Sequence, residues 1–242
     1  MFHTVQGRYG QNADRHAVVQ PAHPHARSFQ PRRRKLSPTR DAAYRATRER
    51  WVLATTGELL DLQGLFDGLP VVLDIGFGGG EGVVQMAAAR PHEAILGCEV
   101  HTPGVALVLE AVTANDWRHV RVVEDDVLDF LPRLPAASLA GIRLWFPDPW
   151  PKKKQQHRRL FRPDVVNRLV NLLVPGATFH VATDIDDYAR QVLEVAAAEP
   201  RLQGGVVPRP DWRPLTRYEQ RGLAAGRTPV DLMFTRVGES QQ

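Results

Sequence analysis

The feature that most constrains the fold of this chain is a regular alternation of apolar runs with segments of helical pattern. The apolar runs lie at residues 71–76, 94–100, 119–124, 141–146 and 177–183. The helical patterns lie between them, at residues 80–90, 103–115, 161–173 and 185–198. Strands that alternate with crossover helices form a parallel sheet with helices on both faces. The sequence therefore predicts an α/β fold with a doubly wound, mostly parallel sheet.

The two ends of the chain depart from this alternation. Residues 230–237 are apolar but follow no crossover helix, so we expect an antiparallel strand at the edge of the sheet. Residues 1–26 lack apolar periodicity, and a basic stretch interrupted by prolines follows them. We therefore expect residues 1–40 to form a basic, disordered arm and residues 41–242 to form a single domain.

Composition narrows the class of protein further. No apolar run approaches the length of about 20 residues that a bilayer requires. The chain starts without a secretory signal, and Cys98 has no second cysteine with which to form a disulfide. These features predict a soluble, cytoplasmic protein with no membrane partner.

Positive charge is concentrated at the N-terminus. Residues 1–50 contain 11 Lys or Arg and 3 Asp or Glu, whereas residues 51–242 contain 20 and 24. A basic tail of this kind binds polyanions such as nucleic acid, or stays solvated as a charged arm. Charge alone leaves both readings open.

A glycine-rich turn follows the first predicted strand, where Asp74 and Ile75 lead into Gly76 and Gly78. Glycines let the backbone approach a ligand closely, and open α/β sheets bind ligands at the carboxyl ends of their strands. The dinucleotide pattern would require glycine at position 81. Glu81 would instead place negative charge where a pyrophosphate binds. The loop disfavours NAD and FAD as cofactors.

Acidic residues lie at the carboxyl ends of three successive predicted strands. Asp74 suits an ammonium or sulfonium cation, and Glu99 suits ribose hydroxyls. Asp126 is our candidate for adenine among the acids 124–126. The alternative is that these acids are solvated loop residues. Together with the glycine loop, the three acids predict S-adenosylmethionine as cofactor.

The fourth predicted strand runs into a loop with three prolines, residues 146–152, which contains Asp148. Rigid loops at strand ends hold catalytic groups. The alternative is a proline-rich connector with Trp150 packed inward. Lys152 begins a basic run that reaches Arg162, in a chain with only four lysines. We expect Lys152, Lys153, Lys154, Arg158 and Arg159 to contact phosphates, unless the run is merely a solvated charged surface.

Over residues 27–236, the chain resembles the bacterial tRNA (guanine-N7)-methyltransferase family. The resemblance depends on several blocks in the same order, at residues 74–78, 97–101, 103–105, 146–152, 182–184, 216–222 and 231–234. It implies a Rossmann-like class I methyltransferase fold, with Asp148 as the catalytic residue. The cofactor residues that it implies are Asp74, Glu99, Asp126 and Asp148, and to these we add Gly76 and Gly78 of the glycine-rich turn. The substrate residues that it implies are Lys152, Asp184, Thr216, Arg217, Tyr218 and Glu219.

The resemblance also implies tRNA as partner and S-adenosylmethionine as methyl donor, with no metal. Both a monomer and a homodimer remain open. The chain departs from the family pattern at Lys154, Gln155 and His157, where the family has arginine, histidine and lysine. These departures put any special role of the three positions in doubt.

The chemistry of guanine N7 bears on the role of Asp148. This nitrogen has a free lone pair, so no proton must be removed before methyl transfer and a general base is not required. We therefore expect Asp148 to orient the guanine as a hydrogen-bond acceptor, with help from Asp184 and Glu219. Two alternatives remain open at this stage: an amino-group methyltransferase and a catalytically silent RNA-binding module.

Overall fold

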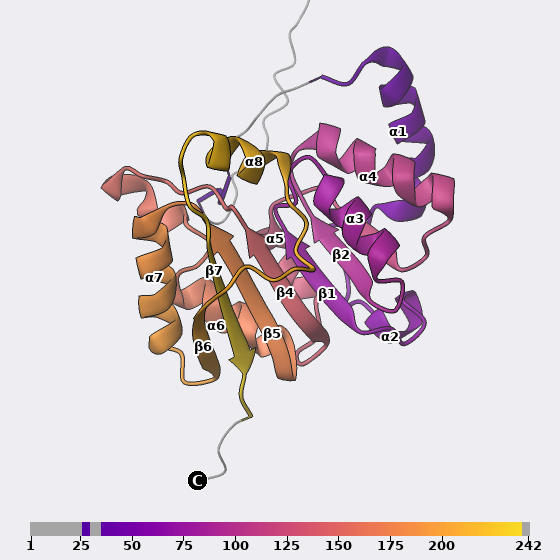
Figure 1. Cartoon of the computed structure of the whole chain (residues 1–242). Coiled ribbons are helices and arrows are strands. Elements are labelled where there is room, and N and C mark those ends of the chain that lie inside the picture. Colours follow the sequence, from indigo (N-terminus) through magenta and orange to yellow (C-terminus); the bar gives the residue numbers. More distant parts are fainter. Residues whose placement is uncertain (1–25, 30–34, 239–242) are drawn as a thin grey trace, which may run out of the picture.

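The computed structural model describes residues 26–29 and 35–238, which form a seven-stranded sheet between two layers of helices (Figure 1). The strands are β1 (Val71–Ile75), β2 (Ala94–Cys98), β3 (Val120–Val123), β4 (Leu139–Trp145), β5 (Leu173–Thr183), β6 (Leu202–Val207) and β7 (Val230–Arg236). The α-helices are α1 (Pro38–Trp51), α2 (Leu62–Leu65), α3 (Glu81–Ala89), α4 (Thr102–Asn115), α5 (Val127–Phe130), α6 (Pro163–Leu172), α7 (Asp186–Ala197) and α8 (Arg217–Ala224). Two 3-10 helices, η1 (Leu131–Arg133) and η2 (Lys153–Arg158), complete the elements.

The strand order is β3-β2-β1-β4-β5-β7-β6. The first five strands run parallel, and β7 pairs antiparallel with both β5 and β6. The predicted doubly wound, mostly parallel sheet is therefore confirmed, and so is the antiparallel direction of the C-terminal strand. The edge of the sheet, however, is β6. Glycines at 204 and 205 and exposed polar positions weaken the apolar pattern of this strand, so the sequence analysis did not identify it.

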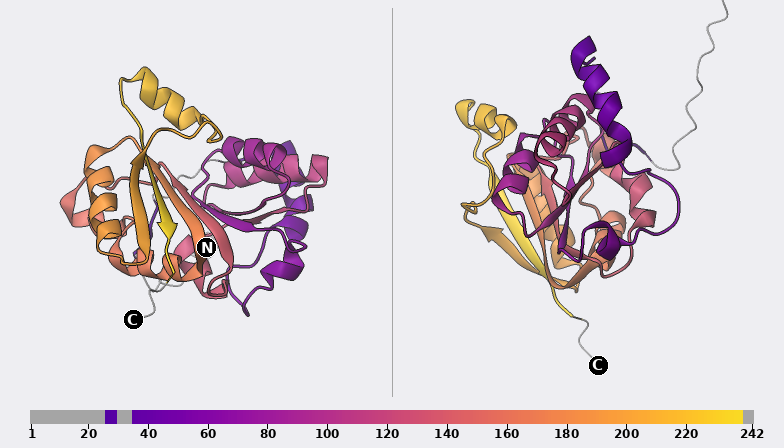
Figure 2. Two further views of the ribbon diagram at one scale, coloured as in Figure 1. Left: turned by 60° about the horizontal axis from the view of Figure 1, so that its bottom comes forward. Right: turned by 90° about the vertical axis from the view of Figure 1, so that its right-hand side faces the viewer.

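The two faces of the sheet have separate hydrophobic cores. One core joins α1, α3 and α4 to the β2–β3 side, and includes Trp51, Met86 and Leu109. The other core joins α5, α6 and α7 to the opposite face, where Phe161 and Tyr188 are fully buried. Figure 2 shows the helices on both sides of the sheet. Apolar side chains at helical spacing meet a sheet that is buried on both faces, as the alternation predicts.

Over β4, β5 and β7, no helix of the described residues covers the first of these faces. Residues 208–216, which we call the strap, run across it from β6 to α8 (Figure 1). The ring of Trp212 lies 6.1 Å from that of Trp145 and 5.4 Å from that of His180. An irregular segment thus takes the place of a helix on this face. No helix within the described part of the chain is both long and apolar enough to cross a bilayer.

The parallel strands all end at one edge, which lies at the top of Figure 1 beneath α8. Two parts of the expected N-terminal arm belong to the folded structure there. Ser28 is buried, and α1 already begins at Pro38. The remainder of the arm, residues 1–25 and 30–34, lies outside the described residues.

Candidate active site

The glycine loop follows β1 at the carboxyl edge of the sheet. Gly76, Gly78 and Gly80 have positive φ angles of 73°, 61° and 88°, which residues with a Cβ rarely adopt. A Cβ added to Gly76 or Gly78 would meet no atom within 4 Å. A Cβ added to Gly104, in contrast, would lie 1.8 Å from the carbonyl oxygen of Gly78. The loop is therefore packed against the start of α4 on one side and presents bare backbone to open space on the other.

Glu99 follows β2 and holds this loop through its carboxylate. One oxygen accepts a hydrogen bond from the Gly78 N–H at 2.5 Å, and the other accepts from the N–H groups of Val100 and His101 at 2.7 and 2.8 Å. Burial raises the pKa of the Glu99 carboxyl, and the three backbone donors oppose that rise. The negative charge of Asp148 adds to the rise, which indicates that Asp148 lies nearby.

Asp74 lies inside β1, in register with Gly97 of β2 and Arg143 of β4. Its side chain is buried, and burial raises the pKa of its carboxyl to about 6. The positive charge of Arg143 opposes this rise, whereas the charge of Glu99 adds to it. A buried acid in this state gains from a cationic ligand that stabilises its ionised form.

Asp126 follows β3 and caps α5 by accepting a hydrogen bond from the Leu128 N–H at 3.1 Å. The same carboxylate accepts from the hydroxyl of Ser28 at 2.9 Å and from its backbone N–H at 3.1 Å. The Ser28 carbonyl in turn accepts from the indole N–H of Trp150 at 3.2 Å. Residues 26–29 therefore connect the third strand end to the proline loop. The sequence analysis missed Ser28, since a lone serine in a basic tail gives no signal.

The proline loop leaves β4 through a strained backbone. Phe146 and Trp150 have positive φ angles of 53° and 42°, which cost energy in residues other than glycine. The Phe146 N–H donates to the carbonyl of Ala182 at 2.7 Å, and Trp150 is buried. The loop is thus rigid and lies at the carboxyl edge, and Trp150 also packs inward as the alternative reading held. Asp148, between these two anchors, is half-buried.

Arg159 fastens the other end of this loop. Its guanidinium donates to the Pro149 carbonyl at 2.8 Å, to Gln191 at 2.6 Å and to Asp187 at 2.7 Å. Only 1% of its side chain is exposed, so our expectation that Arg159 contacts phosphates was wrong. The three lysines before it are exposed, and Arg158 lies 4.8 Å above the Trp150 ring.

The segment that begins at Thr216 forms the helix α8. The Thr216 hydroxyl caps α8 by accepting from the Glu219 N–H at 3.1 Å. Tyr218 is 42% exposed, and its ring lies 5.3 Å from that of Phe146. Arg217 pairs with Glu81 at 3.0 Å. The N-terminus of α8 therefore lies over the start of the proline loop and beside the start of α3.

Asp184 and Glu219 both face arginines. Asp184 follows β5 and pairs with Arg227 at 2.6 Å, with 3% of its side chain exposed. Glu219 is buried and binds Arg213 with both carboxylate oxygens, at 2.6 and 2.7 Å. Tertiary structure thus brings the predicted residues to one edge, but turns the carboxylate of Glu219 toward the strap.

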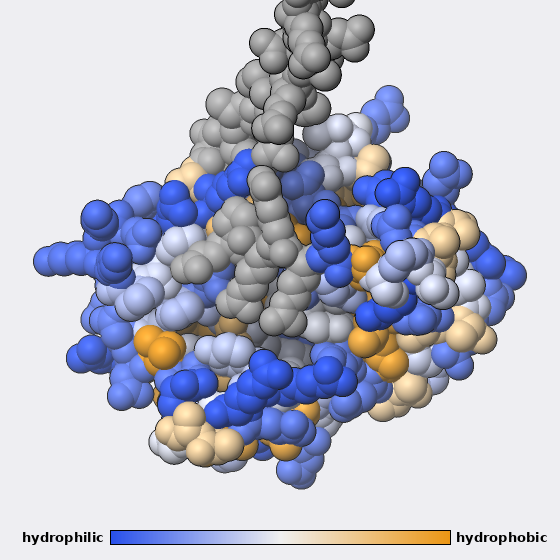
Figure 3. All heavy atoms as spheres, turned by 90° about the horizontal axis from the view of Figure 1, so that it is seen from above, coloured by the Kyte–Doolittle hydropathy of each residue, from blue (hydrophilic) through white to orange (hydrophobic). Residues whose placement is uncertain are grey.

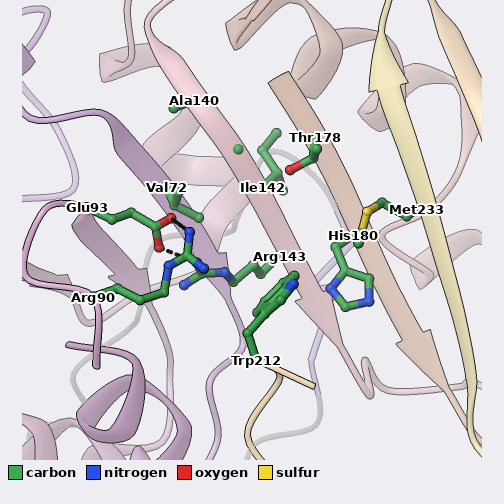
Figure 4. Close-up of a pocket in the computed structure, with 11 residues that line it drawn as sticks. Val72, Arg90, Glu93, Ala140, Ile142, Arg143, Thr178, His180, Trp212 and Met233 are labelled. Carbon is green, nitrogen blue, oxygen red and sulfur yellow. Dashed lines mark hydrogen bonds and ion pairs between the residues drawn. The ribbon is translucent and has the colours of Figure 1, made fainter. Parts of the chain in front are cut away.

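Figure 3 views the molecule from this edge, and hydrophilic side chains make up much of the described surface around it. A separate cavity of about 300 Å³ lies on the sheet face under the strap. Figure 4 shows Arg90 and Arg143 directed at Glu93 on one side of this cavity, with Trp212 and His180 on the other. Among the described residues, no group of three or more His, Cys, Asp and Glu side chains could hold a metal ion.

The strand order, with a glycine loop after β1 and acids at the strand ends, defines a class I methyltransferase. A family model described as "Putative methyltransferase" matches residues 69–232. The crystal structure of the 16S rRNA methyltransferase KamB matches this fold with a TM-score of 0.56, at 16% identity, over 78% of this chain and 99% of that one.

Curated relatives identify the family within this class. A tRNA (guanine-N(7)-)-methyltransferase of Streptomyces avermitilis is 43% identical over 89% of this chain and 77% of its own length. The enzyme with that name from Thiobacillus denitrificans is 43% identical over 89% of this chain and 97% of its own length. That from Nitrosospira multiformis is 41% identical over 86% and 93%. The chain belongs to the tRNA (guanine-N7)-methyltransferase family.

Proposed function

We propose that this protein transfers a methyl group from S-adenosylmethionine to N7 of a guanine in the variable loop of tRNA. The observation that carries the proposal is the grouping of three acids around an open glycine loop. The negative charge of Glu99 raises the pKa of Asp74, and the charge of Asp148 raises the pKa of Glu99. Negative charge at this density favours a cationic ligand.

The residues at the edge fit this methyl donor. The backbone of Gly76 and Gly78 borders open space, where a ligand can approach closely. Asp74 would hold the ammonium group and Glu99 the ribose hydroxyls. Asp126, whose carboxylate already accepts hydrogen bonds from Ser28 and Leu128, would border the adenine. The bound donor supplies an electrophilic methyl group on a sulfonium.

Asp148 would orient the guanine base. Its carboxylate is an acceptor, and the Watson–Crick edge of guanine presents two donors, N1–H and the N2 amine. Adenine presents an acceptor at N1, so the same carboxylate would select against it. Because N7 already has a free lone pair, the protein need only place this atom and exclude competing geometries. Asp184 would support the base from the end of β5.

The tRNA backbone would bind beside this site. Lys152 is exposed at the end of the proline loop, and its compact ammonium suits phosphate oxygens. Across the loop lie Thr216, the N-cap of α8, and Arg217 and Tyr218 in the first turn of this helix. The exposed Tyr218 ring offers a surface on which a base can stack. Lys153, Lys154 and Arg158 extend the positive surface along η2.

Incubation with labelled S-adenosylmethionine and unmodified tRNA tests the proposal. We expect stoichiometric labelling, and chemical cleavage at 7-methylguanine should map the label to one guanine of the variable loop. Methylation of an exocyclic amine instead would support the amino-group alternative. Binding of both ligands without transfer would support a silent RNA-binding module.

A further inference from the structure

Arg213, in the strap, is a fully buried arginine that the sequence analysis did not single out. Its side chain has no exposed surface. Nη1 and Nη2 donate to the two oxygens of Glu219, and Nη2 also donates to Asp231 at 3.0 Å. A buried charge is tolerated only when it is paired and hydrogen-bonded, and here two carboxylates serve one guanidinium. The arrangement ties the strap to α8 and to β7.

The same network reaches the strand that leads to the proline loop. The Trp145 indole N–H donates to Nδ1 of His180 at 3.0 Å. Because an indole nitrogen can only donate, Nδ1 accepts, and the proton of a neutral His180 resides on Nε2. Nε2 then donates to Asp231 at 2.8 Å. A continuous chain of hydrogen bonds therefore connects the end of β4 to Arg213 through β5 and β7.

Glu219 transmits this anchoring to the substrate-facing end of α8. Its carboxylate is held by Arg213, and Arg209 also donates to it at 3.2 Å. Its backbone N–H donates to Thr216, the cap of the helix. The guanidinium of Arg213 also lies 5.5 Å from the ring centre of Phe146, the residue that begins the proline loop. Arg213 thus lies against the start of the proline loop and, through Glu219, fixes the first turn of α8.

We propose that Arg213 is a positioning residue for methyl transfer, which sets the place of Thr216, Arg217 and Tyr218 over the proline loop by binding Glu219 and Asp231. This inference rests on the proposed function and gives Glu219 a different part from the one the family resemblance implies. Glu219 anchors the helix from beneath, and the residues before it face the substrate. The forked geometry of an arginine is required, because a lysine cannot bind both carboxylates in the same way.

The test compares Arg213→Lys with Arg201→Lys in the full chain. Arg201 is a matched control because it is a mostly buried arginine that pairs with Glu199 at 2.7 Å, at the opposite edge of the sheet. For Arg213→Lys we expect kcat/KM for tRNA to fall about 100-fold, the effect of a misplacement of about 1 Å. The affinity for S-adenosylmethionine should stay within about twofold, since the glycine loop is untouched. Arg201→Lys should change neither quantity.

Amide hydrogen exchange supplies a readout that does not depend on activity. In Arg213→Lys, exchange should accelerate in residues 216–224 and stay unchanged in the core strands β1 and β4. If Arg213→Lys does not fold, Glu219→Gln replaces it, and we expect the same local acceleration.

Three outcomes would overturn the inference: unchanged tRNA kinetics in a folded variant, unchanged exchange in α8, or an equal loss of affinity for cofactor and tRNA. Failure of the proposed function is distinguishable. The unaltered protein would then not methylate tRNA at N7, while the exchange data would still decide whether Arg213 holds α8.

Discussion

In the proposed function, Asp74 serves cofactor binding at the expense of folding. Its carboxyl is buried in β1, and burial raises its pKa from 3.8 to about 6. Arg143 opposes the rise but does not cancel it. An acid that is held in this way is ionised at neutral pH only at a cost, and a bound cation would offset that cost. If Asp74 holds the cofactor as proposed, the affinity for S-adenosylmethionine depends on pH.

We predict that the affinity for S-adenosylmethionine rises with pH between about 5 and 7 and levels off above, as Asp74 loses its proton. Asp74→Asn should weaken binding about tenfold or more at pH 7.5 and should flatten this pH dependence. Titration calorimetry at several pH values measures both effects. If the affinity of Asp74→Asn depends on pH as that of the unaltered protein does, another group causes this pH dependence.

Asp148 provides a second test at this scale. The amide NH2 of an asparagine would face the N1–H or the N2 amine of guanine, donor against donor. We therefore predict that Asp148→Asn lowers kcat/KM for tRNA about 100-fold. Single-turnover methylation measures the change, and cofactor affinity is measured in parallel. Asp164→Asn, an exposed acid on α6, is the control. Unchanged turnover with normal cofactor affinity would refute a central role of Asp148.

At the scale of elements, η2 and α8 border the proline loop from two sides. The residues before each of them are mostly prolines or polar residues, so the hydrophobic pattern there is weak. The position of each helix therefore depends on a buried arginine. Arg159 fixes the chain after η2, and Arg213 fixes α8. Exposed positive charge lies on the outer surface of η2, at Lys153 and Lys154, and on the neighbouring Lys152. This surface is suited to a polyanion.

We predict that replacing Lys152, Lys153 and Lys154 with Gln weakens tRNA binding and makes it less dependent on salt. The slope of log K against log salt should fall by about 2 to 3, because each of the three lost phosphate contacts contributes about 0.7 to 0.9. Filter binding at several salt concentrations measures the slope. Arg168→Gln on α6 is the control for a general charge effect, and an unchanged slope in the lysine variant would place the tRNA elsewhere.

At the scale of the whole molecule, two cores hold the sheet from opposite faces, and the acids of the site lie between them. We therefore expect the sheet to remain folded when a single site residue is changed. Burial of the Asp74 carboxyl also lowers the free energy of unfolding at neutral pH. A shift of the Asp74 pKa from 3.8 to about 6 corresponds to about 3 kcal/mol of lost stability above pH 6.

The sign of this effect follows from proton binding. The folded state of Asp74 binds its proton more tightly than the unfolded state, so stability falls as pH rises from about 4 to 6. Asp74→Asn should therefore raise the free energy of unfolding at pH 7.5 by up to about 3 kcal/mol, while the difference should fall below about 1 kcal/mol at pH 4. Urea denaturation at both pH values checks this. A variant that is less stable at pH 7.5 would contradict it.

The sequence by itself determined the order of the first five strands and of the helices α3, α4, α6 and α7, together with the glycine loop and the edge at which the acids meet. These features depend on local periodicity and on the rule that parallel strands end at one edge, so Asp74, Glu99 and Asp148 could be placed together in advance. The resemblance to a family added the block at Thr216.

Only tertiary structure decided which charges face the ligand side and which are internal anchors. In the sequence, Arg159 and Glu219 resemble surface charges, yet both side chains are buried. Arg159 binds Asp187, which is distant in the chain, and Glu219 binds Arg213, which lies in the irregular strap. Ser28 and Arg213 carry no local pattern and acquire their roles from contacts with Asp126 and Asp231. Periodicity records which face of an element is apolar, whereas the pairing of buried polar groups depends on how the elements are packed.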